Sequence, residues 1–233
     1  MLNYKLVNHL KTQYKTAYPF PHIVIDNFMD EIYLKKCLPE LPYCEWGYDY
    51  DEEKTGHQIK KYYTPFDDRG TDHLPEYTRN ILGFLNSMEV INFLEDLTGI
   101  QGLIPDYGYY GGGVHRIQPG GKLSVHADYN YHPITKLHRR LNLLLYLNKD
   151  WKEEWGGDLQ LWEKDLSKPV KIIQPIFNRA VIFSITSDAY HGHPGILKSP
   201  EGVDRYSFAL YYFTEDRPDH EKVDPHMAVF HKT

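Results

Sequence analysis

Apolar side chains in the first hundred residues recur at helical spacing. Between residues 76 and 98 they are Ile81, Leu82, Leu85, Val90, Ile91, Phe93, Leu94 and Leu97. Because residues three and four apart share one face of a helix, this pattern predicts two helices that bury one side each. The other elements predicted in this part are a helix over 2–15, a strand over 21–26, a helix over 30–37 that Asp30 caps, and a loop over 43–75.

After about residue 103 the apolar pattern changes to short runs typical of strands. The predicted strands cover 113–118, 123–128, 139–147, 158–163, 169–174, 179–185, 190–193 and 205–213. Glycine and proline separate them, as in the turn predicted at Gln118-Pro119-Gly120-Gly121. Many short strands punctuated in this way predict an antiparallel sheet that closes or folds into two layers, as in a jelly roll. The expected class is therefore mainly β with flanking helices (α+β), the N-terminal helices packing on the outer face of the sheet.

The chain has 233 residues, 41% of them hydrophobic and 25% charged, which suits a globular protein with a sizeable core. It has no internal repeat and no linker that would divide it. We therefore expect a single domain over 1–233. Within it, residues 1–100 would form a helical support region with one strand, 101–214 the jelly-roll core and 215–233 a polar C-terminal tail.

Charge and cysteine content narrow the class of partner and the compartment. A net charge of -6 does not favour binding to a nucleic-acid backbone. No apolar run approaches the length of a membrane span, and the N-terminus lacks the apolar core of a signal peptide. Two cysteines, Cys37 and Cys44, are too few for a disulfide framework. These features predict a cytoplasmic protein that binds neither nucleic acid nor membranes.

Three distant segments carry the residue types of one iron site. They are His126-Ala127-Asp128, His191 and Arg205-Tyr206-Ser207. Alternation along a strand puts the histidine and the aspartate of the first segment on the same face. Two imidazoles and one carboxylate are the facial triad of non-haem Fe(II) oxygenases, which leaves three metal positions open. An arginine suits a dicarboxylate cosubstrate, because its planar fork can hold both oxygens of one carboxylate.

Several neighbouring residues keep two interpretations each. His191 and His193 alternate, so both can face inward on an extended strand. His115 follows three glycines and either points toward the site or is an ordinary core histidine. Arg139 either lies near the mouth of the pocket or belongs to a solvated basic pair with Arg140.

Longer stretches resemble one enzyme family. These stretches are PHIVIDNF at 21–28, LLLYLNKDW at 143–151, GGDL at 156–159 and NRAVIF at 178–183, the last followed by His191. In this order they resemble the prolyl 4-hydroxylase-like 2-oxoglutarate/Fe(II)-dependent dioxygenases, over nearly the whole chain. The fold that this resemblance implies is a double-stranded β-helix, the jelly roll expected above.

The resemblance also implies roles for single residues. His126, Asp128 and His191 would bind Fe(II), with His191 preferred over His193 as the third ligand. Arg205, Ser207 and Tyr146 would hold 2-oxoglutarate, Arg205 through the distal carboxylate. The cofactors implied are Fe(II), 2-oxoglutarate and O2, with ascorbate as a further candidate.

The activity implied is hydroxylation of an unactivated C–H bond in a small molecule or a peptide, with release of succinate and CO2. A prolyl residue or a proline-like compound is the leading substrate, by family analogy alone. Two other classes stay open: a cupin-like isomerase or lyase, which would not need Arg205, and a binding module with a vestigial site. The oligomeric state is not predicted.

Overall fold

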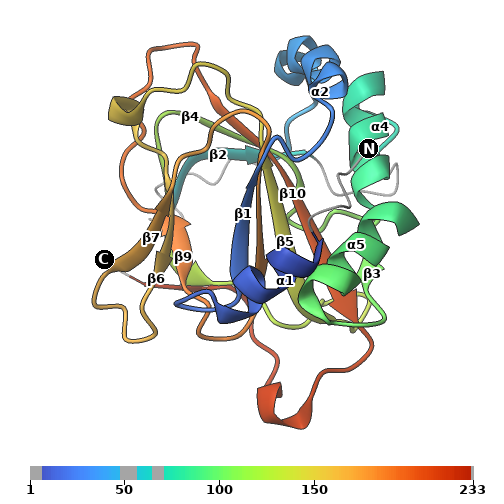
Figure 1. The fold of residues 1–233 in the computed structure, drawn as a ribbon. Coiled ribbons are helices and arrows are strands. Elements are labelled where there is room, and N and C mark those ends of the chain that lie inside the picture. The colour runs from blue at the N-terminus through green and yellow to red at the C-terminus, as the bar shows by residue number, and fades with distance from the viewer. Residues whose placement is uncertain (1–6, 48–56, 65–70, 232–233) are drawn as a thin grey trace.

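The computed structural model describes residues 7–47, 57–64 and 71–231 of the 233-residue chain. A strongly curved sheet forms the body of the described part, and most of its helices gather against one side of that sheet (Figure 1). The sheet has eleven strands within these residues. The pairs of named strands are antiparallel, as the predicted mainly-β jelly roll with outer helices requires.

The helices begin and end close to their predicted positions. They are α1 (Val7–Thr16), α2 (Glu31–Cys37), α4 (Glu76–Leu85) and α5 (Met88–Thr98), with short 3-10 turns η2 (Leu38–Tyr43), η3 (Glu153–Trp155) and η4 (Asp219–Glu221). The Asp30 carboxylate caps α2 by accepting a hydrogen bond from the backbone nitrogen of Ile32. The first helix was predicted over 2–15, of which residues 2–6 lie outside the described part.

The strands follow in chain order. They are β1 (His22–Asp26), β2 (Gln58–Tyr63), β3 (Ile104–Pro105), β4 (Gly113–Ala127), β5 (His138–Tyr146), β6 (Leu159–Trp162), β7 (Pro169–Ile173), β8 (Arg179–Ser184), β9 (His191–His193), β10 (Arg205–Thr214) and β11 (Val229–Phe230). Their order across the sheet is β1-β8-β5-β10-β4-β9-β6-β7. Strands β2 and β11 also pair with β4, and β3 pairs with β10.

Alternation along β10 separates the two faces of the sheet. Phe208, Leu210 and Tyr212 belong to the large core cluster that also contains the buried side chains of α2, α4 and α5. Ser207 and Tyr211, one residue out of step, line a cavity on the opposite face. The helices thus stabilise the outer face by apolar burial, which leaves the inner face available for polar side chains.

Two predictions of local structure are wrong. The loop predicted over 43–75 contains β2, so the described residues before 100 hold two strands, β1 and β2; residues 48–56 and 65–70 of that loop lie outside the described part. The turn predicted at residues 118–121 is an irregularity inside the continuous strand β4. Both errors lie where β2 pairs with β4. The register of this pair shifts between Ile59 and Lys61, and Lys60 has a φ of 46°, so neither strand keeps a regular alternation at this point.

The last described residues return to the sheet. Strand β11 lies in the segment predicted to be a polar tail and pairs Phe230 with His126. The backbone nitrogen of His231 donates to the carbonyl oxygen of Val125 at 2.8 Å. Over the described ranges, none of the helices combines the length and apolar character that crossing a membrane requires.

Candidate active site

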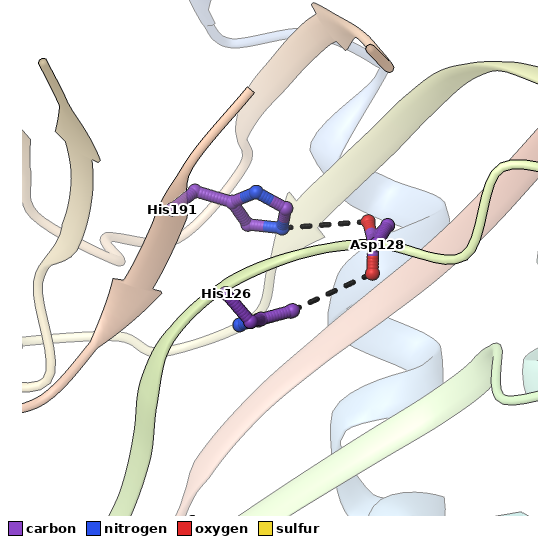
Figure 2. Close-up of side chains that lie close together, drawn as sticks. All are labelled: His126, Asp128 and His191. Carbon is purple, nitrogen blue, oxygen red and sulfur yellow. Dashed lines mark ion pairs between the residues drawn. The ribbon is translucent and has the colours of Figure 1, made fainter. Parts of the chain in front are cut away.

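Strand register brings the three predicted ligands together. His126 lies near the end of β4, Asp128 follows that strand directly, and His191 begins β9. His126 and His191 stand opposite each other in the antiparallel β4–β9 pair. Figure 2 shows both imidazole rings turned toward the carboxylate of Asp128. All three side chains are buried, and their potential ligand atoms lie within 4.8 Å of one another.

The geometry of this cluster suits a metal ion. Nδ1 of His126 donates to the carbonyl oxygen of Ser124 and Nδ1 of His191 to that of Ala189, both at 2.9 Å. These bonds leave each Nε2 as the ligand atom, and the Nε2 atoms lie 3.5 and 3.4 Å from the Asp128 carboxylate. Ligands at adjacent positions of an octahedral ion, with bonds of about 2.1 Å, stand roughly 3 Å apart. The cluster therefore fits Fe(II) with only a small adjustment.

The charges around the cluster favour its metal-binding form. Burial, and then the neighbouring His191, lower the pKa of His126, so its imidazole is neutral near neutral pH. Burial alone would raise the pKa of Asp128, but the Arg139 guanidinium and the two imidazoles hold it well below its usual value. Neutral histidines with an ionised carboxylate are the protonation states that a metal ligand needs.

Two residues of β5 orient Asp128. Nδ2 of Asn142 donates to Oδ2 of Asp128 at 2.8 Å, and Nη2 of Arg139 lies 3.0 Å from the same oxygen. Arg139 is only 1% exposed and also lies over the ring of Tyr211, 3.5 Å from its centroid. The alternative of a solvated basic pair is therefore wrong for Arg139. The sequence offered no signal for Asn142 beyond its inward position on β5.

The cluster opens into a cavity of about 450 Å³. Arg205 and Ser207 line this cavity together with the three candidate ligands. Tyr146 does not line it, but stands opposite Ser207 on β5, with its ring 5.0 Å from the guanidinium carbon of Arg205. The Tyr146 hydroxyl is fully buried, with no partner in hydrogen-bond geometry among the described residues. Such an orphaned donor beside an arginine fits a bound carboxylate.

Arg205 is held in place from one side. Its Nε donates to the carbonyl oxygen of Gly157 at 2.7 Å, so its two terminal nitrogens are the groups that can meet a carboxylate. Two other arginines of the sheet pair elsewhere: Arg179 pairs with Asp26 on β1, and Arg140 pairs with Glu221. Neither lines the cavity.

His193 and His115, for which the sequence left two interpretations, both line this cavity. His193 is buried, and no described group bonds to either of its ring nitrogens. His115 contributes Nε2 to a 3.0 Å contact with the carbonyl oxygen of Gly111. His193 pairs with Leu123 on β4, away from the His126–His191 pair. The geometry thus groups His191, and not His193, with the other two candidate ligands.

The cavity wall includes side chains from two segments that were not predicted to form strands. Lys61 reaches it from β2, which was taken for loop. Phe230 reaches it from β11, with its ring centroid 5.0 Å from that of His126. Only pairing with β4, which is distant in sequence from both, brings these side chains to the site.

Comparison with known proteins agrees with this geometry. Residues 112–213 match the model of the 2OG-Fe(II) oxygenase superfamily, and this stretch contains the three candidate ligands, Tyr146, Arg205 and Ser207. A prolyl hydroxylase from Trichoplax adhaerens, solved in complex with a hypoxia inducible factor oxygen degradation domain peptide fragment, is 22% identical with a TM-score of 0.60. The match covers 91% of this chain and 90% of that chain.

Two further solved structures share the fold. A prolyl 4-hydroxylase from Phytophthora capsici is 20% identical with a TM-score of 0.56; the match covers 90% of this chain but 63% of that one, less than two thirds of its length. HygX from Streptomyces hygroscopicus, with nickel, 2-oxoglutarate and hygromycin B bound, is 12% identical with a TM-score of 0.55, over 97% of this chain and 96% of that one. This chain therefore resembles the 2OG-Fe(II) oxygenase superfamily over residues 112–213, the stretch that contains His126, Asp128 and His191, and it shares the fold of these three solved structures.

Proposed function

We propose that this protein is a 2-oxoglutarate-dependent dioxygenase, with Fe(II) and 2-oxoglutarate as its cofactors, that hydroxylates an unactivated C–H bond of a prolyl residue or a proline-like compound. One oxygen atom of O2 enters the product alcohol and the other enters succinate, as 2-oxoglutarate loses CO2. Bound Fe(II) and 2-oxoglutarate supply the activation of O2. The tasks of the protein are to hold these groups, to orient the C–H bond and to keep the oxidant from water.

His126, Asp128 and His191 hold the iron in this proposal. The observation that carries it is the cross-strand pair of His126 and His191, with Asp128 within 3.5 Å of both Nε2 atoms. Hydrogen bonds from both Nδ1 atoms to backbone carbonyls fix the rings before metal arrives. A preset site of this kind loses little conformational freedom on binding.

Arg205, Ser207 and Tyr146 hold 2-oxoglutarate. Arg205 takes the distal carboxylate in a buried setting, where a charge-assisted pair is strong. Ser207 on β10 and Tyr146 on β5 are directly paired, so their side chains point to the same side of the sheet. Both hydroxyls can therefore donate to the same ligand. This use of Arg205 favours an oxygenase over a cupin-like isomerase, which has no need of a dicarboxylate.

The aromatic side chains that line the cavity favour a proline-like substrate. Tyrosines from four segments line the cavity, namely Tyr63, Tyr110, Tyr129 and Tyr211. Their flat apolar faces suit a compact saturated ring, and a cavity of about 450 Å³ is within the usual size of a small-ligand site. The fold is shared with proteins solved with a peptide fragment and with hygromycin B, so both kinds of molecule belong in the test.

The test has two steps. Anaerobic titration with Fe(II), with and without 2-oxoglutarate, should give one metal per chain and a visible charge-transfer band only when both are present. A screen of L-proline, a proline-containing peptide and hygromycin B, scored by succinate release, should then show stimulation by a proline compound. Stimulation by hygromycin B alone would overturn the substrate class, and absence of the band would overturn the role of the site.

A further inference from the structure

Lys61 is a buried cation that the proposed reaction does not use. It is 5% exposed and lines the same cavity as the candidate metal ligands. None of the described carboxylates lies within ion-pair distance of its Nζ; the nearest recorded contact is the ring of Tyr63, 4.7 Å away at the centroid. Burying a charged ammonium without a carboxylate is unfavourable, so a lysine kept in this position indicates a missing anionic partner.

Register places Lys61 and Arg205 in one row of the sheet. Lys61 pairs with Ile117 on β4, and Ile117 pairs with Arg205 on its other side. Directly opposed residues of antiparallel strands point to the same face, so both cations face the cavity. Two strand spacings separate their backbones by about 10 Å. That separation suits two anionic groups better than one carboxylate shared between them.

The net charge of the cavity also favours a further anionic ligand. Its ionised lining residues are Lys61, Arg139, Arg205 and Asp128. Arg139 and Asp128 pair with each other, and the two charges of Fe(II) balance the two of 2-oxoglutarate. With both cofactors bound, the cavity therefore still carries an excess of positive charge.

The side chains that line the cavity together with Lys61 include donors that an anion can use. His193 has two buried ring nitrogens without a partner among the described residues, and His115 lines the same wall. Burial, with the charge of Arg205, lowers the pKa of Lys61 to about 7. An anion bound beside the ammonium would raise that pKa again, so binding favours the charged form.

We propose that Lys61 and His193 form a carboxylate-binding subsite that selects substrates carrying an acidic group. One lysine and one neutral imidazole offer a single charge and a hydrogen bond, which matches a monoanionic carboxylate. This inference rests on the proposed function, and it refines the substrate class to carboxylate-bearing molecules such as a free amino acid or a peptide with an acidic side chain or C-terminus.

The test uses acetate as the probe and acetamide as its neutral counterpart. The protein is loaded with Mn(II) and saturating 2-oxoglutarate, and the relaxation rate of the probe's methyl protons reports approach to the metal. Acetate should relax faster in the wild type, and its affinity should fall at least tenfold in Lys61→Met but little in Lys61→Arg. Acetamide should show no effect. Lys171→Met, an exposed lysine on β7, is the matched control.

Two outcomes would overturn the inference. Equal acetate relaxation in the wild type and Lys61→Met would mean that Lys61 binds no carboxylate. A tenfold or greater loss of 2-oxoglutarate affinity in Lys61→Met, measured by calorimetry, would assign Lys61 to the cosubstrate instead. If the protein binds no metal, the proposed function fails, and acetate is then titrated against the ring-proton signals of His193 in the metal-free protein, where unchanged signals would contradict the subsite.

Discussion

At the residue scale, two histidines two positions apart should behave differently. His191 stands opposite His126 and lies 3.4 Å from Asp128, whereas His193 stands opposite Leu123. We expect His191→Ala to lose metal binding, because two remaining ligands do not define a facial site. His193→Ala should keep the metal. The iron content of both variants, measured after anaerobic Fe(II) loading and desalting, tests the two expectations. Retention of iron by His191→Ala would contradict the ligand assignment.

Arg205 should decide the affinity for 2-oxoglutarate. Replacing it with alanine removes a buried, charge-assisted contact, which typically costs about 2–5 kcal/mol, or at least roughly 30-fold in affinity. Calorimetric titration of the Mn(II)-loaded protein measures the change. Arg179→Ala is the control, because Arg179 pairs with Asp26 outside the cavity. A loss below about tenfold in Arg205→Ala would mean that another group holds the distal carboxylate.

Lys61 should make stability depend on pH in the metal-free protein. Its pKa is about 7 in the folded chain, against 10.5 for a free lysine. Below pH 7 the charged ammonium is buried at full cost, whereas above 10.5 both folded and unfolded states are neutral and the cost disappears. Arg205, Arg139, Asp128, His115 and His193 share this cavity.

Lys61→Met should therefore be more stable than the wild type by about 1–4 kcal/mol at pH 6.5. The advantage should shrink as the pH rises from 7 to 10, because the unfolded wild type binds a proton that the folded one does not. Urea unfolding of both proteins at pH 6.5, 8 and 9.5 measures the difference. A constant advantage at all three values would show that Lys61 is not titrating abnormally.

At the element scale, the close approach of β9 to β4 depends on Gly192. A Cβ atom at this position would meet the carbonyl oxygens of Ser124 and Leu123 at 2.8 and 2.9 Å. Backbone oxygens cannot rotate away as a side chain can, so Gly192→Ala should push β9 from β4 and move His191 away from His126.

We expect Gly192→Ala to lose about 1–3 kcal/mol of stability and to bind metal more weakly. Gly195→Ala is the matched control, because nothing lies within 4 Å of its added Cβ. Chemical denaturation and Fe(II) titration of both variants provide the two readouts. Wild-type metal affinity in Gly192→Ala would mean that the strand spacing does not set the ligand geometry.

At the scale of the whole molecule, the site joins segments from across the fold. The cavity is lined from β2, β4, β5, β6, β9, β10 and β11, so ligands bound there stabilise the folded chain only. Saturation at about 100 times the dissociation constant adds roughly 2.7 kcal/mol. We expect 2-oxoglutarate to raise the melting temperature in the presence of Mn(II) but not in its absence. An equal rise without metal would contradict binding at the metal.

Most elements could be predicted because their signals are local. Helical spacing in α4 and α5, the Asp30 cap and the apolar runs of β5, β8 and β10 depend on neighbours in the chain. The candidate ligands His126 and Asp128 could be paired from alternation alone. Strand β2 could not, because its sequence QIKKYY is polar and its pairing with β4 shifts register, which breaks the alternation that marks a strand.

The sequence by itself therefore determined the chemistry available to this protein: two histidines, a carboxylate and an arginine in segments that form strands. Only the tertiary structure decided which histidine meets His126, because that choice depends on the register between β4 and β9. It also decided that Arg139 is buried against Asp128 and that Lys61 faces the cavity. These contacts join residues far apart in the chain, and no local pattern carries information about strand pairing over such distances.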